Sequence, residues 1–297
     1  MLISEKVRIG RIVDGTWKFL LVDFITCNAA YLLYYFVFHE QFDFPPQIPT
    51  ILGTALAFFI GFNNNQAYDR WWEARKIWGS IVNGSRSWAA AVLHYLPQNE
   101  TALKQVLVKR NIAFLYLLKN KLRDENSTYF EQYLSKEEAS EIAKRANPIN
   151  ASLEAQSKDL QQLKEEQKID GFTFQVLSNL IEGSYDDLGK SERIKNTVFP
   201  TTYNFYTKIF VWIFIISITV VTAENVGPWS ILFGTLVGYI FLAIQKIGQV
   251  LLNPFKALPT GVPLDQICNT IERDSLDSLG EVNLPEKTQA VEGEYIL

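Results

Sequence analysis

The sequence contains few of the residues that build metal centres or disulfide frameworks. Its 297 residues include two cysteines, Cys27 and Cys268, and two histidines, His39 and His94. The cysteines lie far apart and form no CxxC pattern, so neither a disulfide framework nor a zinc site is predicted. We therefore expect a chain that uses no metal ion and no other cofactor.

The sequence also lacks an excess of positive charge. Its 28 Lys and Arg residues are outnumbered by 32 Asp and Glu residues, which gives a formal net charge of −4. Nucleic-acid-binding proteins usually carry a basic excess, so composition gives no sign of nucleic acid as a partner. The start, MLISEKVRIGRIVDGTW, has no apolar core or small-residue cleavage site, so we expect no secretory signal peptide.

Apolar residues are concentrated in four stretches near the two ends of the chain. The stretch 19–38 contains the single charge Asp23, and the stretches 44–68, 209–223 and 225–245 contain none. A helix needs about 20 predominantly apolar residues to cross the hydrocarbon core of a bilayer. A helix of a soluble protein normally shows a polar face every three or four residues, and the stretches 209–223 and 231–244 lack one. The sequence therefore predicts an all-α membrane protein with four transmembrane helices in two hairpins.

The placement of Lys and Arg predicts how these hairpins are oriented. The turns HEQFDFPPQ and AENVGPW carry neither residue type. The opposite ends of the spans carry Lys6, Arg8, Arg11, Lys18, Arg70, Arg75, Lys76, Lys246 and Lys256. Because cytoplasmic loops are enriched in positive charge, we expect a multi-pass protein of the cell membrane with both termini in the cytoplasm.

Between the hairpins, apolar residues recur at helical spacing with polar faces between them, which predicts a large helical cytosolic region. The pair Asp170–Gly171 interrupts this pattern and predicts a break between two helices. The expected organisation is a cytosolic N-terminal segment, a first hairpin, a cytosolic helical region, a second hairpin and a cytosolic C-terminal segment. These five parts cover residues 1–18, 19–76, 77–204, 205–250 and 251–297.

Two stripes run along the second predicted span. Small residues recur every four positions on one ridge, at Gly53, Ala57 and Gly61. Such ridges let helices approach closely in lipid. One residue further, about 100° around the helix, a second stripe consists of Thr54, Phe58 and Phe62.

A run of four amides, residues 63–66, follows this second stripe directly. Four consecutive amides cannot all face lipid, so some must face water or protein. Rings of Phe58 and Phe62 from several subunits would form an apolar constriction that can gate by dewetting. Contact with lipid or ordinary packing would explain the two phenylalanines equally well. The predicted wet vestibule below the constriction is lined by Asn63, Asn64 and Gln66.

Three segments resemble the bestrophin family, particularly its bacterial branch. They are FNNNQAYDRWWEARKIWGSIVNGSRSWA (62–89), ERIKNTVFPTTY (192–203) and LNPFKALPTGVPLDQICNTIE (252–272). Together with the four-span layout, the resemblance covers nearly the whole chain. It implies a homopentameric ion channel with one central pore, a narrow transmembrane neck and a cytosolic aperture. Animal members of the family are calcium-activated chloride channels, and at least some bacterial members conduct cations.

The resemblance also assigns residues to the pore. Two neck residues fall on Phe58 and Phe62 within FFIGF, and a third falls on Thr54, where relatives usually carry an aliphatic residue. The cytosolic aperture falls near GFTFQV, with Phe172 as the first candidate and Phe174 as the second.

The calcium site of the animal members is a point of difference. An acidic run follows NPF in those proteins, whereas here Lys256, Ala257 and Leu258 follow Phe255. Calcium takes several oxygen ligands, typically including carboxylates. We therefore expect no animal-type calcium clasp; the remaining oxygen ligands would be backbone carbonyls and Asn253.

The predicted neck carries no formal charge, so the sign of the conducted ion follows from weaker features. Aromatic edges carry positive partial charge, and amide N–H groups can donate to an anion, although amide carbonyls can serve a cation. These features nearly balance, but an aromatic rather than aliphatic neck resembles that of the anion-conducting animal members. The resemblance therefore implies passive conduction of chloride or a similar small monovalent anion, with a sodium or potassium channel as the alternative. A carrier or a membrane scaffold is less favoured, because Asp23 is the only carboxylate well inside a span and no inverted repeat is visible. We do not expect an enzyme.

Overall fold

The computed structural model describes residues 9–38, 44–197, 201–291 and 293–297. Within these ranges the chain is helical, apart from connecting segments and an isolated bridge between Val291 and Tyr295. It divides into two compact units. We call Glu5–Arg70 with Val198–Leu252 the apolar unit, and Trp71–Thr197 with Asn253–Leu297 the polar unit.

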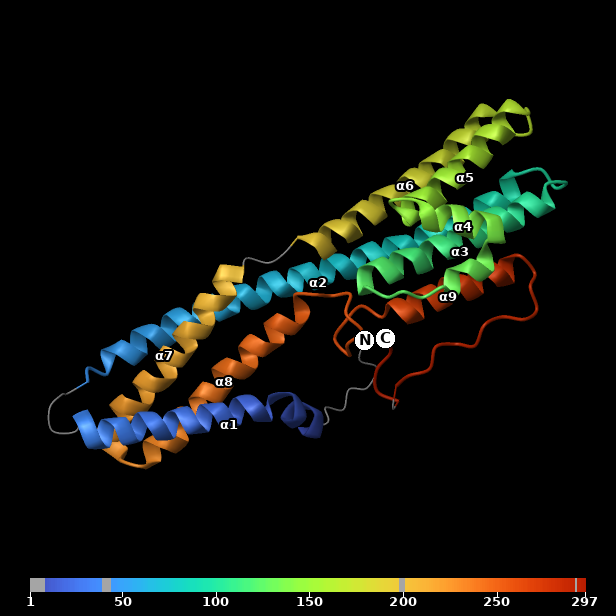
Figure 1. Cartoon of the computed structure of the whole chain (residues 1–297). Helices are drawn as coiled ribbons and strands as arrows, with labels where there is room; N and C mark the ends of the chain where they lie inside the picture. Colours follow the sequence, from blue (N-terminus) through green and yellow to red (C-terminus); the bar gives the residue numbers. More distant parts are fainter. Residues whose placement is uncertain (1–8, 39–43, 198–200, 292) are drawn as a thin grey trace. The chain divides into compact units, whose positions relative to one another are not determined.

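The apolar unit is a group of long helices. It contains α1 (Ile9–Leu33) with a short π-helix, η1 (Tyr34–Phe38), then α7 (Thr201–Val226) and α8 (Trp229–Leu251). These three long helices pack against one another pairwise (Figure 1). The unit also contains the first part of α2 (Gln47–Tyr95), which continues as one helix past the expected hairpin boundary at residue 76.

Three helices of the described chain are long and apolar enough to cross a membrane. They cover Gly15–Phe38, Thr202–Val226 and Trp229–Leu251, and so include the expected spans 19–38 and 209–223 and most of 225–245. The remaining expected span, 44–68, lies in α2, where the amide run lowers the mean hydropathy. A count of four spans therefore stays a prediction.

Small residues allow close helix approach inside the apolar unit. A Cβ atom at Gly238 of α8 would lie 2.6 Å from Oδ1 of Asp23 on α1, and one at Gly53 of α2 would lie 2.9 Å from the ring of Phe214 on α7. A larger residue at either position would force the facing side chain to move, so glycine permits the observed close approach. Gly61, on the same ridge as Gly53, has open space where a Cβ would lie.

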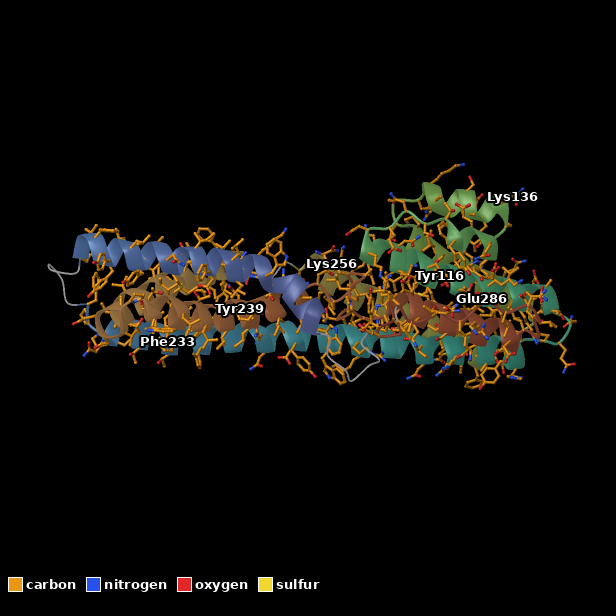
Figure 2. The ribbon with its side chains drawn as sticks, turned by 90° about the horizontal axis from the view of Figure 1, so that it is seen from below. Tyr116, Lys136, Phe233, Tyr239, Lys256 and Glu286 are labelled. Carbon is orange, nitrogen blue, oxygen red and sulfur yellow. The ribbon has the colours of Figure 1, made fainter. Side chains whose placement is uncertain are left out.

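Apolar side chains cover the outside of this unit. Figure 2 shows Phe233 and Tyr239 on α8 among side chains drawn mainly in carbon colour. Phe233 is exposed, as are Leu232, Leu236, Ile240, Ile244 and Ile247 of the same helix. An outward-facing apolar surface of this extent is typical of contact with lipid or with another subunit.

The polar unit is built around α3 (Thr101–Arg123). This helix contacts a 3-10 helix, η2 (Tyr129–Tyr133), and the helices α5 (Pro148–Glu165), α6 (Gly171–Asn196) and α9 (Leu264–Ser278). The short α4 (Lys136–Lys144) packs on α5, and α2 adds buried side chains that include Trp78 and Trp88. Figure 2 shows Tyr116 on α3, with polar atoms frequent around Lys136 and Glu286.

Local capping explains where two of these helices begin. The Ser135 side chain accepts a hydrogen bond from the Glu138 N–H at 3.1 Å. Asp170 accepts one from the Thr173 N–H at 2.6 Å and caps α6. A side-chain oxygen at this position satisfies a backbone donor that the first turn leaves free. The predicted break at Asp170–Gly171 is confirmed.

Candidate functional site

The aromatic stripe of α2 lies on a face that its own subunit leaves uncovered. Phe58 is 75% exposed and Phe62 is 53% exposed. Thr54, one turn earlier, is also exposed, and its hydroxyl donates to the Thr50 carbonyl at 2.9 Å. Because residues four positions apart share one side of a helix, these three side chains form a single outward-facing row.

The opposite face of the same helix segment is buried. Leu56 and Ile60 belong to a core cluster with Phe214 of α7 and Leu242 of α8. The Tyr203 hydroxyl of α7 donates to the Phe59 carbonyl at 3.0 Å. The two faces of α2 therefore have different surroundings, and the aromatic stripe is the side that is open to another molecule.

The amide run is divided between these two faces. Asn63 has no exposed surface, and neither polar atom of its side chain has a hydrogen-bond partner among the described residues. The Asn64 Nδ2 donates to the Ile244 carbonyl of α8 at 3.1 Å. Asn65 and Gln66 are exposed.

Asn63 therefore lies away from the face that carries Phe58 and Phe62, which differs from the expected vestibule. Successive residues turn by about 100° around a helix, so adjacent amides cannot share one environment. Asn64, the second predicted vestibule residue, turns its amide toward α8. The vestibule proposal therefore rests on Gln66 and on the exposed Asn65, which its spacing of three positions from Phe62 would have identified.

The two aperture candidates stand in different surroundings at the start of α6. Phe172 is 83% exposed. Phe174 is partly buried against the core of the polar unit, and the Lys164 ammonium lies 4.4 Å from its ring centroid. Phe172 is thus the side chain that projects outward, which favours it over Phe174.

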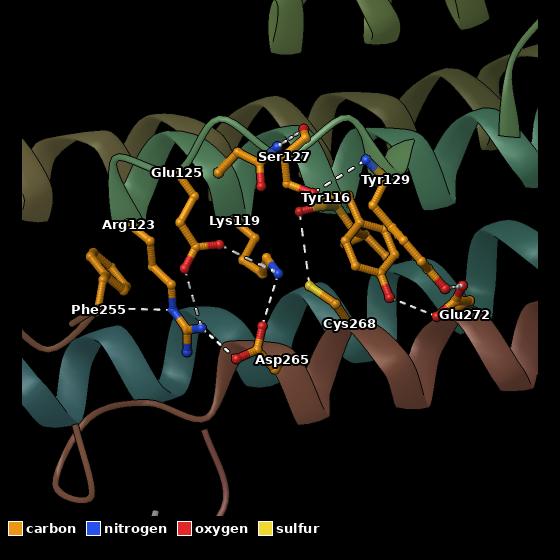
Figure 3. A network of polar contacts seen from close by, with 12 residues as sticks. Tyr116, Lys119, Arg123, Glu125, Ser127, Tyr129, Phe255, Asp265, Cys268 and Glu272 are labelled. Carbon is orange, nitrogen blue, oxygen red and sulfur yellow. Dashed lines mark hydrogen bonds and ion pairs between the residues drawn. The ribbon is translucent and has the colours of Figure 1, made fainter. Parts of the chain in front are cut away.

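The segment that begins at Asn253-Pro254-Phe255, which the resemblance aligned with the animal calcium site, is contacted by an arginine of the same chain. Phe255 is fully buried, and its carbonyl accepts a hydrogen bond from Arg123 Nε at 3.3 Å (Figure 3). Arg123 Nη1 also pairs with Asp265 Oδ2 at 2.5 Å, and Lys119 Nζ pairs with Asp265 Oδ1 at 2.8 Å.

The cations of Lys119 and Arg123 affect the pKa of the Asp265 carboxyl. Burial acts to raise the pKa of Asp265, but hydrogen bonds from Lys119 and Arg123 outweigh it and hold that pKa below its usual value. In the described part of the chain, no three His, Cys, Asp or Glu residues come together as a metal site would require.

A buried carboxylate lies two turns further along α9. Glu272 has no exposed surface and accepts hydrogen bonds from three phenols: Tyr116 at 2.6 Å, Tyr129 at 2.8 Å and Tyr133. Burial raises the pKa of Tyr116 and of Tyr133 above the usual value for a phenol, and the bonds to Glu272 raise it further. This group joins α9 to α3 and η2, and sequence reasoning missed it because its members are far apart in the chain.

Most of the chain matches the sequence profile of a known protein family. The sequence profile described as Bacterial/Fungal Bestrophin protein matches residues 5–277. The chain belongs to this bestrophin family. The resemblance read from the three sequence segments is therefore confirmed.

Several relatives and solved structures are similar to this bestrophin over most of its length. Voltage-dependent anion channel-forming protein YneE of Salmonella typhi is 29% identical, with 94% of this chain and 91% of the relative covered. Voltage-dependent anion channel-forming protein alr2987 of a Nostoc species is 31% identical over 78% of this chain and 76% of its own. A crystal structure of a bacterial bestrophin homologue from Klebsiella pneumoniae matches with a TM-score of 0.82 and 26% identity. The match covers 89% of this chain and 98% of that chain.

Proposed function

We propose that this bestrophin is an ion channel of the cell membrane that conducts chloride or a similar small monovalent anion passively through one central pore. The observation that carries the proposal is the exposed row Thr54, Phe58 and Phe62 on a helix whose opposite face is buried. The relatives named as voltage-dependent anion channel-forming proteins support the sign of the ion.

The proposed pore is shared by five subunits. The first part of α2 is the second membrane span in chain order and brings the number of spans in each subunit to four. It lines the neck with Thr54, Phe58 and Phe62. Aromatic rings around an axis form an apolar constriction, which controls conduction through its wetting. Their positively polarised edges favour an anion over a cation. Gln66 and Asn65 follow as the vestibule, and Phe172 forms the cytosolic aperture.

The proposed channel works without the animal-type calcium clasp. The side chain that reaches the Phe255 carbonyl belongs to Arg123, whose positive charge is paired with Asp265. A guanidinium next to the carbonyl supplies an internal positive charge where a calcium ion would otherwise have to be recruited.

The orientation proposed for the subunit places both termini and the polar unit in the cytoplasm. Support comes from the Lys and Arg residues at the ends of the spans and their absence from the two short outer turns. Neither nucleic acid nor a cofactor takes part in the proposed activity.

Reconstitution of the purified protein in a planar bilayer tests this function. Under a gradient of sodium chloride, a reversal potential near the chloride equilibrium potential supports the anion channel. A potential near the sodium equilibrium potential supports the alternative of a cation channel. Saturating transport at low turnover would identify a carrier. The absence of any ion flux would support the hypothesis that the protein is a membrane scaffold.

A further inference from the structure

The turn between α5 and α6 places a lysine on the ring of Phe174, two positions along the chain from the exposed Phe172. The Lys164 ammonium lies 4.4 Å from the centroid of the Phe174 ring. Phe174 is itself partly buried against the core and therefore offers a fixed base. A cation over the face of an aromatic ring is attracted by the ring quadrupole, which holds the charge in place.

The other charges of this turn are already engaged. Lys168 pairs with Glu100 at 2.7 Å and with Glu166 at 2.8 Å. Asp170 caps α6 through the Thr173 N–H. Glu165 accepts a hydrogen bond from the neutral amide of Gln161 at 2.9 Å.

Lys164 differs from Lys168 in its ion pairing. Its side chain is exposed, and no carboxylate in the described part of the chain lies within ion-pair distance of it. Its positive charge is thus available to an ion that passes nearby. Without it, the carboxylates of Glu165, Glu166 and Asp170 would face only the charge of Lys168.

We propose that Lys164, held on the Phe174 ring, determines the preference of the cytosolic aperture for anions. The inference deepens the proposed function and depends on the aperture lying at Phe172. Lys164 raises the local concentration of anions at this constriction. It also offsets the surplus of carboxylates around the turn, so that the aperture does not select cations.

The test compares two lysines four positions apart at the same turn. Lys164→Gln removes the unpaired charge and keeps most of the stem that covers Phe174. Lys168→Gln is the matched control, because it makes the same change in net charge where the lysine is already paired with two carboxylates. Lys164→Arg retains the charge and the capacity to lie on the ring.

The measurement is the permeability ratio of chloride to sodium, from reversal potentials of the full-length variants in planar bilayers. We expect Lys164→Gln to lower this ratio about threefold at 0.15 M salt, where the Debye length is about 8 Å. The ratio of Lys164→Arg should stay near that of the wild type, and Lys168→Gln should lower the ratio less than Lys164→Gln does. At 1 M salt, where the Debye length is about 3 Å, the effect of Lys164→Gln should shrink, which a purely structural role would not produce.

Two results would contradict the role proposed for Lys164. An unchanged ratio in Lys164→Gln, or an equal loss in Lys168→Gln, overturns the role of Lys164. Phe172→Ala serves as the reference for the aperture: if it changes conductance while Lys164→Gln leaves the ratio unchanged, the inference alone fails. If the wild type carries no current, the proposed function fails and the inference fails with it.

Discussion

Tyr116 donates a 2.6 Å hydrogen bond to Glu272, a carboxylate with no exposed surface, across 156 positions of the sequence. The pair fixes α9 to the central helix of the polar unit. Tyr129 donates to the other carboxylate oxygen at 2.8 Å and is itself 42% exposed.

We expect Tyr116→Phe to destabilise the protein more than Tyr129→Phe does. Removing a donor from a buried charged acceptor costs about 1–3 kcal/mol, and water can replace the lost donor more easily next to the exposed Tyr129. The measurement is the apparent melting temperature of the purified protein in detergent. Equal melting temperatures for the two variants would show that Glu272 does not depend on the buried phenol.

Phe58→Ala and Phe62→Ala should each change single-channel conductance or ion selectivity by at least about twofold while the assembly stays intact. The reason is that each change widens and hydrates an apolar constriction. Phe59→Ala is the matched control, because this neighbouring ring lies beside Tyr203 of α7, with ring centroids 5.9 Å apart. If Phe58→Ala and Phe62→Ala both conduct as the wild type does, the neck lies elsewhere.

Currents should not change between about 1 mM calcium, a concentration that fills even weak calcium sites, and an excess of chelator. Arg123 already bonds the Phe255 carbonyl and pairs with Asp265, so no ion has to be recruited to this segment. The measurement is steady-state current from one bilayer before and after chelation, with magnesium as the control ion. A reversible rise of current with calcium would contradict the proposal.

Cys268 should resist alkylation in the folded protein. Burial is the main cause that raises the pKa of its thiol to about 12, and the thiolate is the reactive form. We expect slow labelling of the variant Cys27→Ala by a maleimide at about pH 8, where an ordinary thiol is partly ionised, and rapid labelling after unfolding.

The raised pKa of the Cys268 thiol also makes the stability of the protein depend on pH. The folded pKa lies above that of the unfolded thiol, so the contribution of Cys268 is fully present at neutral pH. It is lost as the pH rises from about 9 toward 12, since only the unfolded thiol then ionises. Cys268→Ser should therefore show a smaller drop in melting temperature between about pH 8 and pH 10 than the wild type. An equal drop in both proteins would contradict this account.

Local patterns were enough to predict much of this protein. Uninterrupted apolar runs predicted the long helices of the apolar unit, because spanning a bilayer depends on length and composition alone. The four-residue spacing of Thr54, Phe58 and Phe62 predicted that they share one face, because helix geometry makes that so. The residues after Asn253-Pro254-Phe255 showed directly that no acidic run follows.

Only the tertiary structure decided which face of α2 is covered and which distant side chains meet. Asn63 is buried and Gln66 exposed, although both are amides in one run, because α7 and α8 cover a single side of the helix. Glu272 accepts a hydrogen bond from Tyr116, and Lys164 contacts the Phe174 ring, because separate helices pack together. Periodicity along one helix carries no information about the partner that another helix brings to it, so these contacts appear only once the chain is folded.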